Sequence, residues 1–369
     1  RSQKLKSIYM IILIVANDTE RNTFISNLVS SIQNLADVYT GISHFWSDEN
    51  SFDIIHIHWP EHLSYKVNRK SFPPYFGRLK KIKARLEFLK KQGSKIVYTR
   101  HNIQSNENEK GFKQLYNLIN TSANGIIHMA KYSLDEYKMH YPQKDVKHTI
   151  IPHGWYNNIP NIIDKKSARK FLNIDKNTFV ILAFGAIRNI EEENFIIKAF
   201  TQLNCKNKLL IIPRGYYNNE ILLYRFLDFI KFPLYKYLTK RKSKRLSTKK
   251  IRWNQEFTAI NKIQYYFNAA DIILIPRLNI LNSGNVPMAF YFKKPVIGPN
   301  KGNVGYILKE TNNLIFNTED ITSLTSKYEE GINISNGNRG QENYEFAKTN
   351  WDWKPIGQRH LEFYDKLLL

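Results

Sequence analysis

The sequence predicts an α/β protein made of two doubly wound parallel sheets, each with helices on both faces. Three observations support this prediction. Short apolar runs alternate with amphipathic stretches of helical spacing, the alternation restarts after residue 164, and 369 residues suit two domains of ordinary size. Residues 155–164 are polar, aromatic and without periodicity, and we predict that they form a linker between the two sheets.

Strands and helices follow one another regularly in the first half of the chain. Apolar runs of strand length predict strands over 8–16, 52–57, 95–99, 125–128 and 148–152. Apolar residues at helical spacing predict helices over 21–34, 76–92, 109–121 and 131–139. The first of these helices places Phe24, Leu28 and Ile32 on one face, and Asp18 or Thr19 is its predicted cap.

The second half repeats this pattern. Its predicted strands are 179–184, 209–212, 271–276 and 295–298, and its predicted helices are 192–203 and 284–292. The last residues, 338–369, are also helical in pattern, and we expect this segment to pack back across both domains.

The net charge of +23 is concentrated in two segments. Residues 66–100 hold twelve basic residues and one acidic residue, and residues 225–252 hold eleven basic residues and one acidic residue. We therefore expect an anionic partner at two places rather than over the whole surface. Basic residues mixed with aromatic and aliphatic ones suit docking on an anionic membrane. The membrane candidates are Lys80, Lys83, Lys240, Arg241, Lys242 and Arg245.

A solvated helix face and a mobile basic loop are the plain alternative for these two segments. Nucleic acid is the other anionic partner, but no RRM, KH, OB or helix-turn-helix signature supports it, so we expect none. The longest apolar run, 8–16, is too short to span a bilayer, which needs about 20 residues.

Missing motifs exclude several common chemistries. The sequence has no P-loop, no dinucleotide-binding glycine motif after its first strand and no nucleophile elbow. One cysteine, Cys205, excludes a disulfide framework and a cysteine-based zinc site. Because there is no Asp-x-Asp motif and no histidine pair with metal-ligand spacing, we expect no metal and no cofactor.

Polar or ring-bearing residues follow most of the predicted strands. In doubly wound folds the functional residues lie at the carboxyl ends of the strands, so this coincidence has a physical reason. A capping or turn role is the alternative for any one of them. The residues are His58, Trp59 and Glu61; Arg100, His101 and Asn102, with Glu107 close behind; His153; Gly185 and Arg188; and Arg214.

The histidines differ in what we expect of them. His56 and His58 alternate along one strand, and we expect them to face opposite sides, so that only His58 lines the site. His128 is predicted to form a hydrogen bond in the core. His153 is either a turn residue or a site residue, and the sequence does not decide between these roles.

A second candidate site binds an anion. Ser283 and Gly284 precede a predicted helix whose first backbone amides lack intrahelical partners, and glycine allows a phosphate to approach closely. Arg188 and Arg214 would then complete a clamp for a diphosphate. The alternative is a serine cap with surface arginines.

Several stretches of the chain resemble glycosyltransferases of the GT-B fold, group 1 (GT4-like), of the bacterial exopolysaccharide and capsule type. In the second half the similar stretches are LAFGAIR at 182–188, AADIILIP at 269–276 and NSGNVPMAFYFKKPVIGP at 282–299. In the first half they are DIIHIHWPE at 53–61, YTRHNIQSNE at 98–107 and IIPHGWY at 150–156. Their order and spacing extend over most of the chain.

This resemblance implies two Rossmann-like domains with a cleft between them. Residues 1–158 would form the acceptor domain, 159–350 the nucleotide-sugar domain, and 351–369 a helix that returns to the first domain. The implied donor-binding residues are Gly185, Arg188, Arg214, Asn282, Ser283, Gly284 and Asn285. The implied catalytic residues are His101, Glu107 and Glu61, and the implied acceptor-binding residues are His58, Trp59 and Asn102.

The sequence departs from this group in two places. A lysine that usually follows Arg188 is absent, and Glu191 and Glu192 lie nearby, so Arg214 is the implied substitute for the lysine. The usual Glu-x7-Glu pattern is absent at 280–288, where the Ser-Gly variant of the exopolysaccharide enzymes is present.

The resemblance also implies the function. The implied enzyme would be a glycosyltransferase that moves a sugar from a UDP-, GDP- or TDP-linked donor to a lipid-linked or oligosaccharide acceptor in surface polysaccharide biosynthesis, with retention favoured over inversion. We expect it in the cytoplasm, peripheral on the inner face of the cytoplasmic membrane. A sugar-nucleotide epimerase of the same fold, which needs extra carboxylates, is one alternative. A catalytically silent partner protein that binds an anion or nucleic acid is another.

Overall fold

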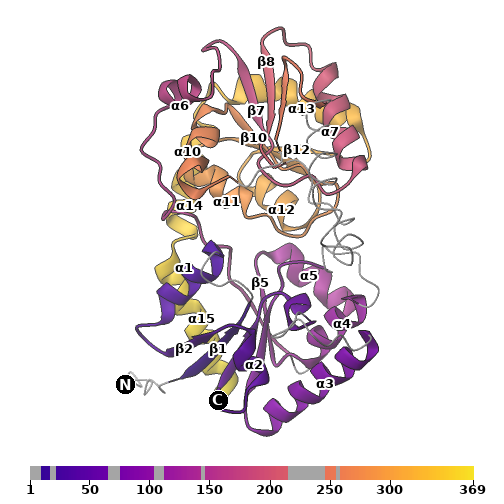
Figure 1. Ribbon diagram of the computed structural model, residues 1–369, viewed down its shortest axis with the longest axis vertical. Helices are drawn as coiled ribbons and strands as arrows, with labels where there is room; N and C mark the ends of the chain where they lie inside the picture. Colours follow the sequence, from indigo (N-terminus) through magenta and orange to yellow (C-terminus); the bar gives the residue numbers. More distant parts are fainter. Residues whose placement is uncertain are drawn as a thin grey trace, which may run out of the picture. The chain divides into compact units, whose positions relative to one another are not determined.

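A computed structural model describes residues 10–16, 22–64, 75–103, 112–142, 146–214, 246–254 and 258–369 (Figure 1). The chain divides into two compact units. Unit 1 comprises residues 1–154 together with 352–369, and unit 2 comprises residues 155–351. The sequence placed these boundaries at 158 and 350.

Unit 1 is built on a six-stranded parallel sheet with the strand order β2-β1-β3-β4-β5-β6. Its elements are β1 (Ile11–Val15), α1 (Thr23–Ile32), β2 (Asp37–Thr40), α2 (Ile42–Trp46), β3 (Ile54–Ile57), the 3-10 helix η1 (Pro60–Ser64), α3 (Tyr75–Lys91), β4 (Lys95–Thr99), α4 (Phe112–Ser122), β5 (Gly125–His128), α5 (Lys131–His140), β6 (Lys147–Ile150) and α15 (Trp353–Leu368).

Apolar side chains cover both faces of this sheet. On one face, strand residues such as Leu13 and Ile55 pack with the buried apolar residues of α3 and α4 in a single core. On the other face, α15 packs on α1 and reaches β5 (Figure 1). The approach is close, because a Cβ on Gly125 would lie 2.7 Å from Leu367 and 2.8 Å from Phe363. The last helix of the chain therefore completes unit 1.

Unit 2 is built on a second six-stranded parallel sheet, with the strand order β12-β11-β10-β7-β8-β9. Its elements are α6 (Lys165–Phe171), β7 (Phe179–Leu182), α7 (Ile190–Gln202), β8 (Lys208–Ile212), β9 (Ile251–Trp253), α10 (Ile260–Ala269), β10 (Ile272–Leu274), α11 (Asn285–Tyr291), β11 (Val296–Pro299), α12 (Gly302–Glu310), β12 (Leu314–Phe316), α13 (Ile321–Ile334) and α14 (Arg339–Asn350).

These two sheets confirm the predicted α/β class with doubly wound parallel sheets. The predicted linker 155–164 contains no helix or strand. The predicted cap of α1 is wrong, because Asn22 accepts the backbone N–H groups of Phe24 and Ile25 through its side chain. The sequence analysis missed β2, an edge strand whose residues are exposed or half-buried and therefore carry no apolar run.

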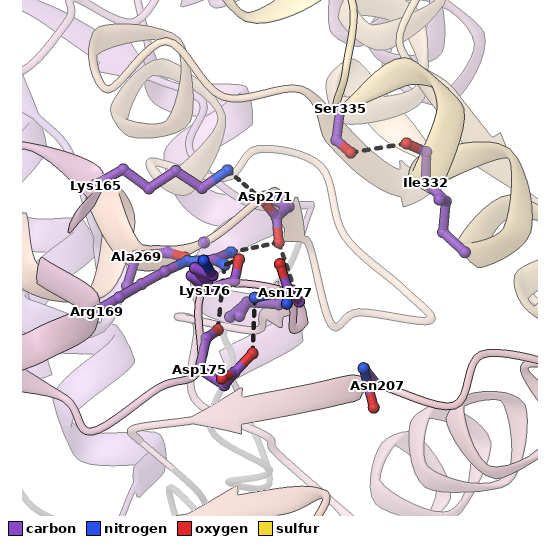
Figure 2. Close-up of polar contacts among 12 residues, drawn as sticks. Lys165, Arg169, Asp175, Lys176, Asn177, Asn207, Ala269, Asp271, Ile332 and Ser335 are labelled. Carbon is purple, nitrogen blue, oxygen red and sulfur yellow. Dashed lines mark hydrogen bonds and ion pairs between the residues drawn. The ribbon is translucent and has the colours of Figure 1, made fainter.

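A buried ion-pair network holds α6 against the sheet of unit 2. Figure 2 shows the Asp271 carboxylate between Lys165 and Arg169, at 2.5 Å from Lys165 Nζ and 2.7 Å from Arg169 Nη2. The same carboxylate accepts the backbone N–H of Val180 at 2.7 Å. Arg169 is 6% exposed and also donates to the carbonyl oxygens of Ala269 and Lys176. Because Arg169 is buried, the Asp271 carboxylate provides the counter-charge for its guanidinium.

The change Asp271→Asn is expected to lower the free energy of unfolding by about 3 kcal/mol, since it leaves a buried guanidinium without its counter-charge. Urea titrations followed by tryptophan fluorescence would measure the loss. Asp135→Asn is the matched control, because Asp135 and its partner Lys131 are both more than half exposed and such pairs contribute about 0–1 kcal/mol. Equal losses in the two variants would contradict the structural role of Asp271.

Candidate active site

The ends of β3 and β4 bring a cluster of histidines together in unit 1. His58 follows β3 and His101 lies two residues after β4, and the two rings share a hydrogen bond of 2.9 Å between His58 Nδ1 and His101 Nε2. The Trp59 ring stacks on His101 with ring centroids 4.3 Å apart. Phe24 of α1 contacts both histidines through its ring edge.

Side chains of α15 also contact this cluster. The Tyr364 hydroxyl lies 2.7 Å from His56 Nδ1, and His56 Nε2 lies 2.7 Å from the Thr99 hydroxyl. His360, one turn earlier, donates its Nδ1–H to the carbonyl oxygen of Ile356 at 2.8 Å. The tail of the chain therefore supplies two of the groups that surround His56.

The expectation that His56 and His58 face opposite sides of their strand is wrong. Their ring centroids lie 4.1 Å apart, and both side chains are fully buried. The physical reason is the two-residue period of a strand, which directs residues i and i+2 to the same side. His128, as predicted, is buried and hydrogen-bonds in the core, with Nε2 at 3.2 Å from His148 Nδ1.

The histidine cluster is held in the neutral form. Burial lowers the pKa of His56, His58 and His101 well below the usual histidine value, and neighbouring histidines lower it further. Burial also lowers the pKa of His360 to about 4. At neutral pH these rings are therefore uncharged, and they interact through neutral hydrogen bonds.

The other candidates in unit 1 are placed differently. Glu61 is 6% exposed, and its Oε2 accepts the Tyr116 hydroxyl at 2.7 Å. Asn102 follows His101 and is half-buried. Arg100 is buried and pairs with Glu136 at 2.5 Å, so it has a structural role. Glu107 lies outside the described residues.

His153, whose role the sequence left open, lies beside the cluster. Its ring contacts Phe24 at a centroid distance of 4.8 Å, and its Nδ1 donates to the carbonyl oxygen of Gly154 at 2.6 Å. A Cβ on Gly154 would lie 2.2 Å from the Trp353 ring, so this position admits only glycine without rearrangement. The segment after β6 is thereby locked against the start of α15.

In unit 2, the start of α7 fixes Arg188. Asn189 caps the helix by accepting the Glu192 N–H at 2.8 Å, and Glu192 Oε2 accepts the Arg188 N–H at 2.8 Å. This reciprocal pattern corresponds to a capping box. It explains the glutamate near the proposed diphosphate site, because the Glu192 side chain is turned towards the backbone and is only 3% exposed.

Arg277 joins the same group of residues, although the sequence analysis did not select it. It lies three residues after β10, is 8% exposed, and donates through Nη1 to Glu192 Oε2 at 3.2 Å. The pKa of Arg277 is lowered to about 10, mainly by burial and also by Arg188 and Arg214, while Glu192 opposes the shift. Arg277 and Arg188 thus share one carboxylate, and Arg214 is near enough to act on Arg277.

The predicted phosphate loop contacts the segment that follows β7. A Cβ on Gly185 would lie 2.9 Å from Asn285 Nδ2, so the loop after β7 contacts the start of α11. The Asn285 N–H donates to the Ser283 hydroxyl at 3.3 Å. The side chain of Asn282 accepts from Asn303 at 2.7 Å, which ties the loop to α12. Gly284 begins α11 and is half-buried.

The membrane candidates are only partly within the described residues. Lys80 and Lys83 are exposed on α3 and line a hollow of about 810 Å³ between α3 and α4. Lys113, Asn117 and Thr121 of α4 line it as well. Lys240, Arg241, Lys242 and Arg245 lie outside the described residues. Among the residues that are described, no helix is both long enough and apolar enough to cross a bilayer.

Within the described ranges, no three or more His, Cys, Asp or Glu side chains form a group that could hold a metal ion. The histidine cluster of unit 1 is thus joined by ring contacts and hydrogen bonds.

Comparison with known proteins gives similarity in structure alone. No family model matches the chain, and no curated protein matches its sequence. Among solved structures, HepE of Anabaena in complex with UDP is 15% identical with a TM-score of 0.67, over 97% of this chain and 100% of that chain. HepE has also been solved with UDP-glucose.

Two further structures are similar over almost their whole length. Sucrose-phosphate synthase of Thermosynechococcus elongatus is 12% identical with a TM-score of 0.70, over 96% of this chain and 98% of that chain. A glycosyltransferase of Rickettsia africae is 14% identical with a TM-score of 0.64, over 98% of this chain and 99% of that chain. The protein therefore has the two-domain, Rossmann-like GT-B fold, which confirms the fold that the sequence resemblance implied.

Proposed function

We propose that this protein is a glycosyltransferase that transfers a sugar from a nucleoside diphosphate donor to a glycan acceptor. The observation that carries this proposal is the convergence of Arg188, Arg214 and Arg277 in unit 2. They follow β7, β8 and β10, which are three adjacent strands of the sheet. The similarity in fold to HepE, which has been solved with UDP and with UDP-glucose, supports a nucleotide-sugar donor.

Fixed positive charge is what this reaction needs. When the bond from sugar to phosphate breaks, negative charge develops on the leaving diphosphate, and positioned cationic donors stabilise it without reorganisation. Guanidinium groups match phosphate oxygens with two parallel hydrogen bonds. Because the arginines supply the charge, we expect transfer to continue in the presence of EDTA.

Unit 1 is the proposed acceptor side, with His58, Trp59, His101 and Asn102 as its contacts. A stacked aromatic ring beside polar groups suits the flat apolar face and hydroxyl edge of a sugar. We propose retention of the anomeric configuration. The Glu61 carboxylate is buried against the Tyr116 hydroxyl, which supports a route in which a donor phosphate oxygen takes the proton instead of Glu61.

A panel of UDP-, GDP- and TDP-sugars would test the proposal. Donor hydrolysis and a thermal shift are expected with one nucleoside, and NMR of the product would give the anomeric configuration. If no nucleotide in the panel shifted the melting temperature or was hydrolysed, the proposed function would be wrong.

We further propose that the acceptor is lipid-linked, in surface polysaccharide biosynthesis, and that the protein works at the inner face of the cytoplasmic membrane. The exposed lysines on α3, together with the basic segment 225–252, support an anionic surface as the partner.

The double change Lys80→Gln and Lys83→Gln is expected to weaken binding to anionic vesicles about 30-fold, since each lysine near such a surface contributes about 1 kcal/mol. Co-sedimentation with vesicles of phosphatidylglycerol and phosphatidylcholine would measure this. The matched control is Lys138→Gln with Lys354→Gln, both exposed in unit 1. Equal binding by the two double variants would show that α3 does not contact the membrane surface.

A further inference from the structure

The position of Arg277 in the sheet places it at the same edge as Arg188 and Arg214, the proposed donor-binding arginines. It follows β10, which pairs with β7, and β7 in turn pairs with β8. Parallel neighbouring strands end at the same edge of a sheet, so the segments after these three strands lie together. Arg277 thus belongs to the same edge as Arg188 and Arg214, although 89 and 63 residues separate them in the chain.

The charges around Arg277 are not balanced by Glu192 alone. Glu192 Oε2 receives both the Arg277 guanidinium and the Arg188 backbone N–H. The same carboxylate also interacts electrostatically with the Arg188 guanidinium, so one negative charge faces two guanidinium groups. Repulsion among the arginines and burial both act against the charge on Arg277. A buried cation in this situation is stabilised by a further anion that binds beside it.

We propose that Arg277 is a third donor-binding residue, which contacts the diphosphate of the nucleotide sugar together with Arg188, and that Glu192 is a positioning residue. Glu192 holds the Arg277 guanidinium and the Arg188 backbone in place before the donor binds. This inference rests on the proposed function. It also accounts for a glutamate at an anion site, because that glutamate orients an arginine.

Two variants test the proposal, one that removes a positive charge and one that removes a negative charge. Arg277→Met removes the guanidinium but keeps an unbranched apolar side chain, and it is expected to raise the Kd for the best nucleoside diphosphate about tenfold to hundredfold. Glu192→Gln keeps an oxygen for the Arg188 N–H but removes the competing charge, so its Kd is expected to stay equal or to fall. A purely structural ion pair would instead make both variants bind equally poorly.

Binding of three ligands would show whether Arg277 interacts with the diphosphate part of the nucleotide. Isothermal titration with the nucleoside diphosphate, the matching nucleoside and inorganic pyrophosphate is expected to show weaker binding to Arg277→Met for the two diphosphates only. Arg252→Met controls for the loss of one charge, because Arg252 is exposed on β9 and donates to the carbonyl oxygens of Leu172 and Asn173. Circular dichroism confirms that each variant is folded, and Arg277→Lys replaces Arg277→Met if the latter unfolds.

The outcomes separate this inference from the proposed function. If wild type binds the diphosphate and Arg277→Met binds it equally well, Arg277 is no ligand and the function stands. An equal loss for nucleoside and diphosphate would likewise overturn the inference, since it would indicate general damage. If wild type binds no nucleotide at all, the proposed function fails, and the inference that rests on it fails too.

Discussion

Replacing Arg188 by alanine is expected to lower kcat/KM for sugar transfer by about 100- to 1000-fold, the usual effect of removing one positioned group that stabilises developing negative charge. The reason lies in how the residue is held. Its backbone N–H is fixed by Glu192, whose carboxylate pairs with Arg277 and also interacts electrostatically with the Arg188 guanidinium. One carboxylate therefore faces two guanidinium groups, which leaves net positive charge for the leaving diphosphate.

Initial rates measured at varied donor concentration would test this prediction. They would also show how much of the loss in kcat/KM comes from kcat and how much from KM. A fall in kcat indicates a contact made in the transition state, whereas a rise in KM alone indicates a contact made equally in the bound donor. Arg252→Ala, which also removes one positive charge from unit 2, is the control and is expected to keep wild-type rates. A kcat/KM for Arg188→Ala within threefold of the control would contradict the proposed diphosphate clamp.

Acidification is expected to unfold unit 1 between about pH 6.5 and pH 4. The folded state holds His56, His58, His101 and His360 neutral by burial, whereas in the unfolded chain each titrates near pH 6.5. The unfolded state therefore binds more protons in this range, and stability falls as pH falls. For His360 alone, a folded pKa of about 4 corresponds to a loss of about 3 kcal/mol once the pH is below 4.

Urea midpoints at pH 7.5, 6.0 and 5.0 would measure this loss. The variant His360→Phe is expected to flatten the dependence between pH 6 and pH 5, because one buried titrating ring is gone. His140→Phe is the control, since the His140 side chain is 63% exposed and its removal leaves the buried cluster intact. A wild-type midpoint that did not change with pH would show that the histidine cluster is not linked to stability.

Local patterns in the sequence predicted most of the elements but missed the strands β2, β9 and β12 and the helices α2, α6, α10, α12 and α13. Strands such as β4 and β5 are buried on both faces, so they appear as unbroken apolar runs. The edge strand β2 lacks this signal because its residues alternate between exposed and half-buried. The helix α7 was predicted from its apolar face, while its capping box, Asn189 with Glu192, went unrecognised although both residues are visible in the sequence.

The candidate site was predicted only in part from the sequence. The rule of functional residues at strand ends selected His58, His101 and Arg188, which the sheets do place at their carboxyl edges. It did not select Arg277, although this residue follows a strand and a proline just as the selected Arg214 does. A systematic search of every predicted strand end for cations would have found it.

What the sequence determined by itself is the alternation of strands and helices, its restart after the linker and the residues that follow each strand. These features depend on backbone geometry and on neighbours a few residues apart. Only the tertiary structure decided that Tyr364 contacts His56, 308 residues away, and that Glu192 holds Arg277, 85 residues away. Such pairs depend on strand order and on how the last helix packs, and neither is encoded in any local period.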